Sequence, residues 1–408
     1  MRILIVSQYF WPEQFVINDL AVALASSGHV ITVATGKPNY PTGRIWPGYH
    51  KEGVTWETYS GSIEVIRVPL RPRGRAGAFD LLLNYASFVV SGLKLPRLLR
   101  GRSFDVVFFF GVSPMTAAIP AVILARVKKA HLALWLQDLW PESLVGSGLV
   151  TNRIVLNGVE LMMRLIYRSA QTLLLQSRAF SASVERLTSR EKIFYLPNPA
   201  PIEGDYQEDI PREVKGFSNS HFTVVFAGNL GRAQALDTVL GAASLLRVHP
   251  NIRIMLVGTG SEADNVRRKV ITQGLDNVVL AGPFERSAMA AVYRNANVLL
   301  VTLRDEVALN SVIPSKIQAY MQAGKPIIGA LNGEGARLIQ ESKCGLVVKA
   351  QDSESLARCI LTMSSMPAST LEAMGQAGRS FFLENFEVGN VAQKLTAILE
   401  NRLGNKSD

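Results

Sequence analysis

The chain has 408 residues, which is too long for one ordinary hydrophobic core and predicts two domains of roughly 150–200 residues each. Apolar residues make up 48% and charged residues 19%, a composition that excludes a disordered chain. The only cysteines, Cys344 and Cys359, exclude a disulfide framework. The five histidines show no metal-ligand spacing, so we expect no metal site.

The net charge of +10 lies entirely in the first half of the chain. Residues 1–200 carry 22 Lys+Arg and 12 Asp+Glu, whereas residues 201–408 carry 21 of each. This asymmetry predicts an anionic partner for the first half, which could be a nucleic acid, a membrane surface or a phosphorylated substrate.

In the first half, short apolar runs alternate with helical patterns. A helix is expected at 16–27, and strands are expected at 2–6, 30–35, 65–68, 106–110, 132–136 and 172–175. Continuous apolar runs are typical of parallel strands that are covered on both faces. The connections are long enough for crossover helices, so the pattern predicts a doubly wound α/β domain.

A Pro-rich segment at 196–202 and a polar segment at 203–220 interrupt this pattern, which then restarts. Helices are expected at 236–248, 371–384 and 388–403, and strands at 222–227, 253–257, 278–281, 298–301, 326–330 and 345–348. We therefore predict an α/β fold with two Rossmann-like, doubly wound domains that face a cleft. The domains would span 1–200 and 201–385, and a final helix in 386–408 would pack back on the first.

Two glycine-rich turns follow strands of the second domain. Gly228 and Gly231 come after its first strand, and Gly258 and Gly260 come after its second. Glycine lets the backbone approach a ligand closely, and the N-terminus of the next helix can hold phosphate oxygens. Arg232 could add a charge-assisted contact. The turns favour a phosphate site, with plain tight turns as the alternative.

A lysine opens a later helix of the second domain, where Ser315 and Lys316 follow Pro314. A cation at a helix N-terminus opposes the helix dipole, so its presence predicts a nearby anion such as a diphosphate. The alternative is a solvated surface lysine.

Carboxylates follow two strands of the first domain. Glu13 comes after the strand at 2–6, and Asp138 and Glu142 come after the strand at 132–136. They could act as acid/base groups or bind hydroxyls, or Asp138 could simply cap a turn beside a packed Trp140. The proline-containing loop at 37–41 could contact a substrate or form a structural turn.

The segment from Arg67 to Arg102 places eight cations and one acid, Asp80, around an apolar stretch at 79–93. We favour a helix at a membrane interface, with its cations on anionic headgroups, over an ordinary core helix. Nucleic-acid binding is not favoured, because no recognised signature accompanies the charge. No signal peptide or spanning segment is predicted, so we expect a cytoplasmic protein peripherally associated with the inner membrane.

Five short motifs, in this order, resemble the family 4 nucleotide-sugar glycosyltransferases, which have the two-Rossmann glycosyltransferase B architecture. They are Ser7-Gln-Tyr-Phe-Trp-Pro-Glu13, Lys37-Pro-Asn-Tyr-Pro41, Gln137-Asp-Leu-Trp-Pro-Glu142, Gly228-Asn-Leu-Gly231 with Gln234, and Pro314-Ser-Lys316. The motifs are most similar to a bacterial branch that builds O-antigen, capsule and colanic acid, and that includes fucosyl and N-acetyl-L-fucosaminyl transferases.

The resemblance implies which residues bind the two substrates. A nucleotide-sugar, UDP-linked rather than GDP-linked, would bind the second domain without a metal or other cofactor, through Gly228, Asn229, Gly231, Arg232, Gln234, Gly258, Gly260, Pro283, Ser315 and Lys316. A polyprenyl-diphosphate-linked saccharide would bind the first domain through Lys37, Asn39, Tyr40 and Arg73. The carboxylate pair common in the family is replaced by Ser311 and Ala319, which leaves Asp138, Glu142 and Glu13 as catalytic candidates.

The expected activity is that of a hexosyltransferase, and the resemblance suggests N-acetyl-L-fucosamine from its UDP donor as the sugar. Two alternatives stay open. A nucleotide-sugar epimerase of the same architecture would need no lipid acceptor, so membrane association would argue against it. A non-catalytic sugar-nucleotide-binding protein would bind UDP without turnover.

Overall fold

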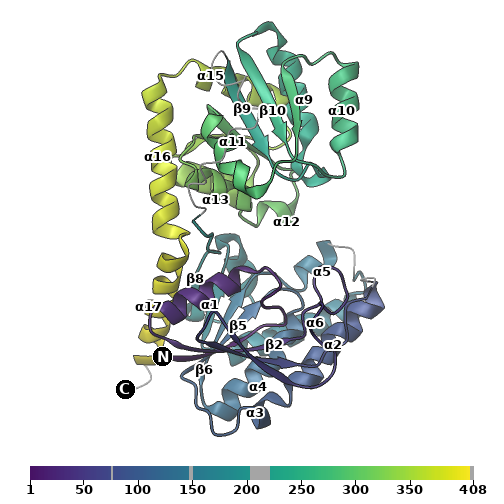
Figure 1. Cartoon of the computed structure of the whole chain (residues 1–408), viewed down its shortest axis with the longest axis vertical. Coiled ribbons are helices and arrows are strands. Elements are labelled where there is room, and N and C mark those ends of the chain that lie inside the picture. The colour runs from purple at the N-terminus through teal and green to yellow at the C-terminus, as the bar shows by residue number, and fades with distance from the viewer. Residues whose placement is uncertain (75–76, 147–149, 203–220, 405–408) are drawn as a thin grey trace. The chain divides into compact units, whose positions relative to one another are not determined.

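Each half of the chain folds around one β-sheet whose strands are mostly parallel (Figure 1). The computed structural model describes residues 1–74, 77–146, 150–202 and 221–404. It divides into two units, of which unit 1 contains Met1–Pro199 and Val388–Asp408 and unit 2 contains Ala200–Glu387. The connector expected at 203–220 lies outside the described residues.

Eight strands form the sheet of unit 1, in the order β3-β4-β2-β1-β5-β6-β7-β8. They are β1 (Arg2–Val6), β2 (Val30–Gly36), β3 (Thr55–Tyr59), β4 (Ile63–Val68), β5 (Val106–Gly111), β6 (His131–Leu136), β7 (Thr172–Leu175) and β8 (Ile193–Tyr195). The six strands expected from apolar runs are confirmed. The edge strand β3 contains no apolar run and pairs antiparallel with β4, so the apolar-run pattern does not predict it.

Helices cover both faces of this sheet. They are α1 (Val16–Ser26), α2 (Ala78–Gly92), α3 (Leu95–Leu98), α4 (Ala118–Lys128), α5 (Glu142–Gly146), α6 (Arg153–Ser169), α7 (Ser181–Glu185) and α17 (Val388–Gly404). The C-terminal helix α17 packs beside α1, where Leu395 and Leu399 join the core of unit 1. A hydrogen bond of 3.0 Å from Arg402 to the carbonyl of Gln171 also ties α17 to this unit.

Six parallel strands form the sheet of unit 2, in the order β11-β10-β9-β12-β13-β14. They are β9 (Phe222–Ala227), β10 (Ile252–Val257), β11 (Val278–Gly282), β12 (Val298–Thr302), β13 (Ile327–Ala330) and β14 (Gly345–Val348). The strand order reverses between β9 and β12. Loops at the carboxyl ends of strands diverge at such a switch point and leave room for a ligand.

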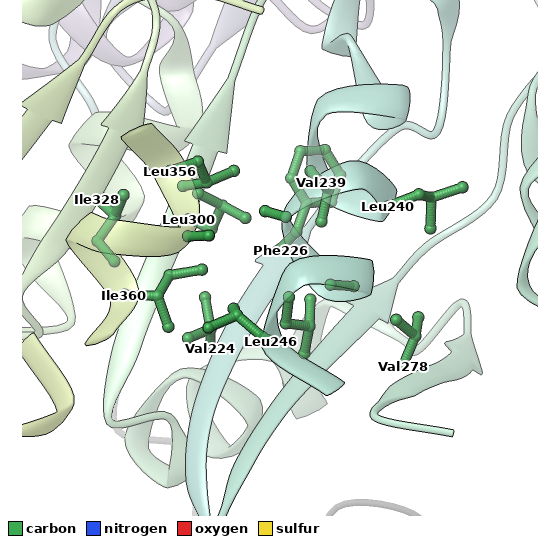
Figure 2. Close-up of a cluster of buried hydrophobic side chains, with 14 of the residues drawn as sticks. Val224, Phe226, Val239, Leu240, Leu246, Val278, Leu300, Ile328, Leu356 and Ile360 are labelled. Carbon is green, nitrogen blue, oxygen red and sulfur yellow. The ribbon is translucent and has the colours of Figure 1, made fainter. Parts of the chain in front are cut away.

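The helices of unit 2 are α9 (Leu236–Leu245), α10 (Ala263–Thr272), α11 (Met289–Asn295), α12 (Val307–Asn310), α13 (Ser315–Gln322), α14 (Gly333–Glu341), α15 (Ser353–Ser364) and α16 (Ala368–Asn385). Alternate residues of β9 serve two cores. Val224 and Phe226 point toward α9 and α15 (Figure 2), whereas Val225 packs on the opposite face. Each fully buried side chain of this size stabilises the fold by about 1.5–3 kcal/mol.

Candidate active site

The two glycine-rich turns of unit 2 lie against each other. The N–H of Gly228 donates to the carbonyl of Val257 at 2.9 Å, and the N–H of Leu230 donates to that of Thr259 at 2.8 Å. Gly228 and Gly258 both have φ near 133°, a conformation that favours glycine. A Cβ on Gly258 would lie 1.9 Å from the Gly228 carbonyl oxygen, and one on Gly260 would lie 2.6 Å from that of Leu230.

This packing alone requires glycine at positions 258 and 260, because the first loop occupies the space above the second. Phosphate contacts at these two residues stay a prediction. The first loop itself is more open: Gly228 and Asn229 are exposed. Among the described residues, nothing accepts a hydrogen bond from the N–H of Asn229 or Gly231, so both could donate to a ligand.

Lys316 lies beside this open loop. Its Nζ donates to the Gln234 side-chain oxygen at 2.6 Å and lies 3.8 Å from the centre of the Phe226 ring. A Cβ on Gly228 would come within 3.4 Å of the lysine Nζ, so the lysine borders the loop at its glycine. Burial lowers the pKa of Lys316 to about 7. Its partners are an amide and a ring face, neither of which carries a charge.

Arg232 occupies a different side of the loop. Its side chain is 83% exposed, and its Nε lies 3.5 Å from a Glu262 carboxylate oxygen. It borders a cavity of about 300 Å³ whose lining includes Gly231, Glu262 and Arg304, but not Lys316. The structure therefore does not bring the two predicted cations together in one cavity.

The other donor-binding candidates lie at the same edge of the sheet. Pro283 follows β11 directly, and the Gly282 carbonyl before it accepts from the Gly258 N–H at 2.8 Å. Ser315 is the exposed first residue of α13, with Pro314 as its N-cap. Tyr320 on α13 fixes this helix to the end of β9, because its hydroxyl donates to the carbonyl of Ala227 at 3.1 Å and accepts from its N–H at 2.9 Å.

In unit 1, Glu13 holds two strand-end loops together. The residue is only 1% exposed. Its carboxylate accepts from the N–H groups of Asn39 and Tyr40, both at 2.7 Å, and of Phe10 at 3.3 Å. Burial raises the pKa of Glu13, while these backbone hydrogen bonds act in the opposite direction. Its contacts are those of a carboxylate that positions the 37–41 loop.

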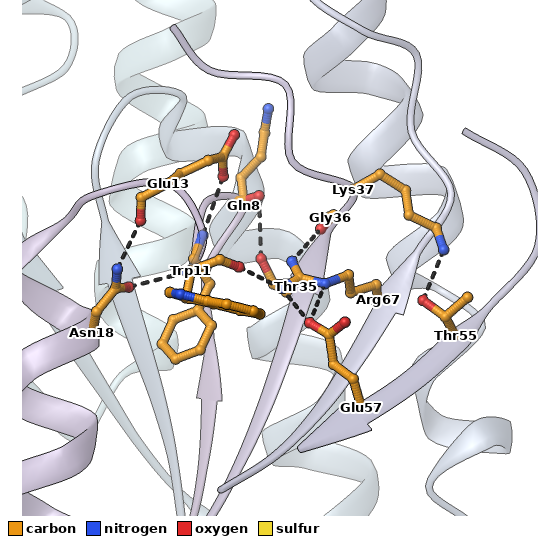
Figure 3. Close-up of polar contacts among 11 residues, drawn as sticks. Gln8, Trp11, Glu13, Asn18, Thr35, Gly36, Lys37, Thr55, Glu57 and Arg67 are labelled. Carbon is orange, nitrogen blue, oxygen red and sulfur yellow. Dashed lines mark hydrogen bonds and ion pairs between the residues drawn. The ribbon is translucent and has the colours of Figure 1, made fainter. Parts of the chain in front are cut away.

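Arg67 lies at the centre of the polar network beneath these loops (Figure 3). It is fully buried on β4, donates to Glu57 at 2.6 Å and to the Gly36 carbonyl at 3.2 Å, and also contacts the Trp11 carbonyl. The expectation that Arg67 belongs to a membrane-facing basic surface is therefore wrong. The guanidinium charge is balanced inside unit 1, where it contacts one carboxylate and two backbone carbonyl groups.

Lys37 is also buried, with its Nζ donating to the Thr55 hydroxyl at 2.8 Å (Figure 3). Burial lowers the pKa of Lys37, and the neighbouring Arg67 lowers it further. Asn39 is buried as well and accepts from the Arg73 N–H at 3.1 Å. Of the predicted acceptor-binding residues, Tyr40 and Arg73 are thus the more accessible pair.

Asp138 follows β6 and remains partly exposed. One carboxylate oxygen accepts from the Ser113 hydroxyl, and the other accepts from the Leu139 N–H at 3.1 Å. The buried Trp140 donates to the same serine at 3.0 Å. Glu142 instead pairs with Arg186 at 2.8 Å, in a contact between side chains that are 40% and 70% exposed. Asp138 is therefore held more firmly than Glu142.

Two tyrosine rings lie near Arg73, and sequence patterns single out only one of them, Tyr40. The arginine Cζ lies 5.2 Å from the ring centre of Tyr40 and 6.0 Å from that of Tyr9. Tyr85 on α2 interacts electrostatically with both Arg73 and Asp138. The helical periodicity of 78–92 could have indicated Tyr85, because it shares the inner face of α2 with the buried Asn84 and Phe88.

The outer face of α2 carries an apolar stripe. Phe79, Leu82 and Val90 are 61–69% exposed and recur at helical spacing, and Leu93 just beyond the helix is 48% exposed. The inner face is buried, as the core-helix alternative predicts. Contact of the outer face with a membrane stays a prediction. Within the described part of the chain, none of the helices has both the length and the apolar character that crossing a bilayer requires.

The fold defines a two-domain α/β protein with the glycosyltransferase B architecture. The family model described as "Glycosyl transferase 4-like domain" matches residues 14–199, and the one described as "Glycosyl transferases group 1" matches residues 221–366. The two matches together span most of the chain, which belongs to the glycosyltransferases built from these domains and is a hexosyltransferase.

Bacterial sugar transferases are among its relatives. The chain is 23% identical over 338 residues to "Putative colanic acid biosynthesis glycosyl transferase WcaI" of Escherichia coli (strain K12), covering 79% of this chain and 82% of that protein. It is 25% identical over 332 residues to "Probable glycosyltransferase WbjE" of Pseudomonas aeruginosa, covering 79% and 80%.

A solved structure shares the fold. The crystal structure of Anabaena HepE in complex with UDP matches 98% of this chain and 100% of that chain, with a TM-score of 0.66 and 14% identity. At that identity the likeness shows the architecture alone.

Proposed function

We propose that this glycosyltransferase transfers a sugar from a UDP-sugar, bound by unit 2, to a polyprenyl-diphosphate-linked saccharide, bound by unit 1, in the assembly of a bacterial surface polysaccharide. N-acetyl-L-fucosamine is the sugar that the sequence resemblance favours. The names of the two bacterial relatives and the UDP in the HepE structure support the class of donor and the pathway.

The observation that carries the proposal is the position of Lys316. A partly buried amine with uncharged partners is poorly stabilised as a cation, and an approaching diphosphate would raise its pKa and bind it as an ammonium ion. The free N–H groups of Asn229 and Gly231 would add donors for the phosphate oxygens. Fixed donors of this kind stabilise the departing nucleoside diphosphate.

Asp138 is the proposed general base. The acceptor hydroxyl would attack the anomeric carbon, the bond from that carbon to the diphosphate oxygen would break, and the hydroxyl proton would pass to Asp138. Ser113 and the Leu139 N–H fix the carboxylate for this role. Glu13 would act as a positioning residue, because both of its oxygens are occupied by backbone N–H groups.

The decisive experiment measures UDP release from a panel of UDP- and GDP-linked sugars, with a short-chain polyprenyl-diphosphate saccharide as acceptor. We expect turnover with UDP-N-acetyl-6-deoxyhexoses and little with GDP-sugars. A folded enzyme that releases no UDP from any donor would refute the proposal, and preferred use of a GDP-sugar would refute the assignment of the donor.

The proposed location is the cytoplasmic face of the inner membrane, with the apolar stripe of α2 inserted among the lipids. Flotation with vesicles that contain anionic lipid tests this. We expect the wild-type chain to float and the double variant Leu82→Glu, Val90→Glu to remain unbound. Ile271→Glu is the matched control, because it changes an apolar side chain that is 72% exposed on a helix of unit 2. Equal flotation of all three proteins would contradict the proposal.

A further inference from the structure

The guanidinium of Arg73 lies near aromatic rings and forms no ion pair with a carboxylate of the described residues. Its Cζ lies 5.2 Å from the ring centre of Tyr40 and 6.0 Å from that of Tyr9, and its Nε is buried with no hydrogen-bond partner among the described residues. By contrast, Arg71 on the same loop pairs with Asp80 at 3.3 Å and is 53% exposed. A partly buried cation without an opposite charge is costly to the fold unless a ligand supplies one.

The hydroxyls of the tyrosines near Arg73 have no described acceptor, and that of Tyr9 belongs to a side chain that is 2% exposed. The Tyr9 hydroxyl accepts a hydrogen bond from the Gln8 side chain at 3.3 Å, which leaves its proton free to donate. In the ranges that the structure describes, the hydroxyls of Tyr40 and Tyr85 form no hydrogen bond. Burial raises the pKa of Tyr9 and that of Tyr85, so both stay protonated at neutral pH.

An acceptor group is buried beside these donors. Gln8 is 1% exposed, and its side-chain oxygen has no partner among the described residues. Its amide nitrogen donates to Asn84 at 2.7 Å, which fixes the side chain between β1 and α2. The site therefore offers one cation, three hydroxyl donors and one amide oxygen, a set that suits an oxyanion carried by a hydroxylated molecule.

We propose that Arg73, Tyr9, Tyr40 and Tyr85 form a subsite for an oxyanionic group of the acceptor, phosphoryl or carboxylate. The inference rests on the proposed function and adds the chemical class of the acceptor group. Besides burial, Asp138 contributes to the raised pKa of Tyr85, which is consistent with a subsite on the same side of unit 1 as the proposed general base. The oxyanion would then lie close to the sugar that receives the transferred residue.

Helix α2 indicates which oxyanion the subsite meets. It carries Tyr85, whose pKa burial raises and the charge of Arg73 lowers, on its inner face and the apolar stripe of Phe79, Leu82 and Val90 on its exposed face. If the stripe enters a lipid layer, the subsite is on the same helix and lies near headgroup depth, where a lipid-linked diphosphate is found. A uronic acid within the saccharide is the second source of the same chemistry.

The test compares Arg73→Gln with Arg71→Gln, a control that removes a paired cation from the same loop. Three acceptors carry the same saccharide on a short prenyl diphosphate, on a neutral alkyl group, and on the alkyl group with a uronic acid added. We expect Arg73→Gln to raise the KM for a charged acceptor about 10- to 100-fold, with the neutral acceptor, kcat and donor KM changed less than about twofold. Arg73→Lys should recover part of the loss.

The charged acceptor that shows the penalty identifies the source of the oxyanion. An equal penalty on the neutral acceptor, or no penalty on either charged one, would overturn the subsite. A binding measurement separates this result from failure of the proposed function. Tryptophan fluorescence of the full chain, with UDP present, should report binding of the short prenyl diphosphate by wild type and Arg71→Gln but not by Arg73→Gln, even if no donor is turned over. Equal binding of the prenyl diphosphate by all three would exclude it as the source of the oxyanion, and equal binding of the uronic acid acceptor as well would refute the subsite.

Discussion

The affinity of unit 2 for a UDP-sugar should fall as the pH rises above 7. Burial lowers the pKa of Lys316 to about 7 in the free protein, so the lysine loses its proton within the physiological range. A bound diphosphate favours the ammonium form and raises the pKa again. Binding above pH 7 must therefore take up a proton, and each further pH unit weakens it.

The size of the effect follows from the fraction of lysine that is protonated before binding. With a pKa of about 7, roughly nine-tenths of the free protein carries the charge at pH 6 and about 3% carries it at pH 8.5. If the pKa in the complex exceeds 9, the Kd should rise about 30-fold between these pH values, which corresponds to about 2 kcal/mol. The diphosphate of a sugar nucleotide keeps its charge over this range, so the lysine is responsible for the change.

Isothermal titration calorimetry with a UDP-sugar and no acceptor measures this profile, and buffers of different ionisation enthalpy report the proton uptake directly. Lys316→Arg is the matched control, because an arginine stays charged and should give a flat profile. Lys316→Gln should bind weakly at every pH. A wild-type Kd that is constant from pH 6 to 8.5, or an equal slope in Lys316→Arg, would refute the argument.

Three further predictions concern single residues. Lys316→Met should stabilise the ligand-free chain by about 2 kcal/mol at pH 7, after allowance for partial exposure. Because the folded pKa is lowered, wild-type stability should increase from pH 7 toward 10, and denaturant unfolding should show no such increase in the variant. Asp138→Asn should lower kcat about 10²- to 10⁴-fold with an unchanged circular dichroism spectrum, whereas Glu142→Gln should lose far less in the same assay. Glu13→Gln should lower the free energy of unfolding, measured in urea, by about 1–3 kcal/mol, because an amide nitrogen would face backbone donors. An unchanged urea midpoint would show that the loops do not depend on this carboxylate.

Most strands of the fold could be predicted because they are buried on both faces. The runs at 106–110 and 222–227 are uninterrupted apolar segments, and the structure has β5 and β9 there. The edge strand β3 is different: it is largely exposed and reads Thr-Trp-Glu-Thr-Tyr, so neither a run nor a strong alternation marks it. Because β3 was not predicted from the sequence, Glu57 on that strand was not identified as the ion-pair partner of Arg67.

The motifs indicated the position of the site better than the role of each residue in it. Strand-end loops meet at one edge of a parallel sheet, so Glu13 and the 37–41 loop could be expected near each other. That the Glu13 carboxylate accepts from three N–H groups depends on the path of the 37–41 loop, which has no local signal. The role of Gly258 could not be predicted either. A glycine that is required by a neighbouring loop and one that is required by a bound phosphate cannot be distinguished in the sequence.

What distinguishes the candidate ligand-binding cations is the charge that is missing around them. Arg67 and Arg337 are paired with Glu57 and Glu334, so their charges are balanced within the fold. Lys316 contacts an amide and a ring, and Arg73 contacts rings. Burying a cation without a counter-charge costs free energy. An anion that binds beside it removes this cost, and the anion therefore binds more tightly. A cation of this kind lies at the carboxyl edge of each sheet, as the proposed binding of two anionic substrates requires.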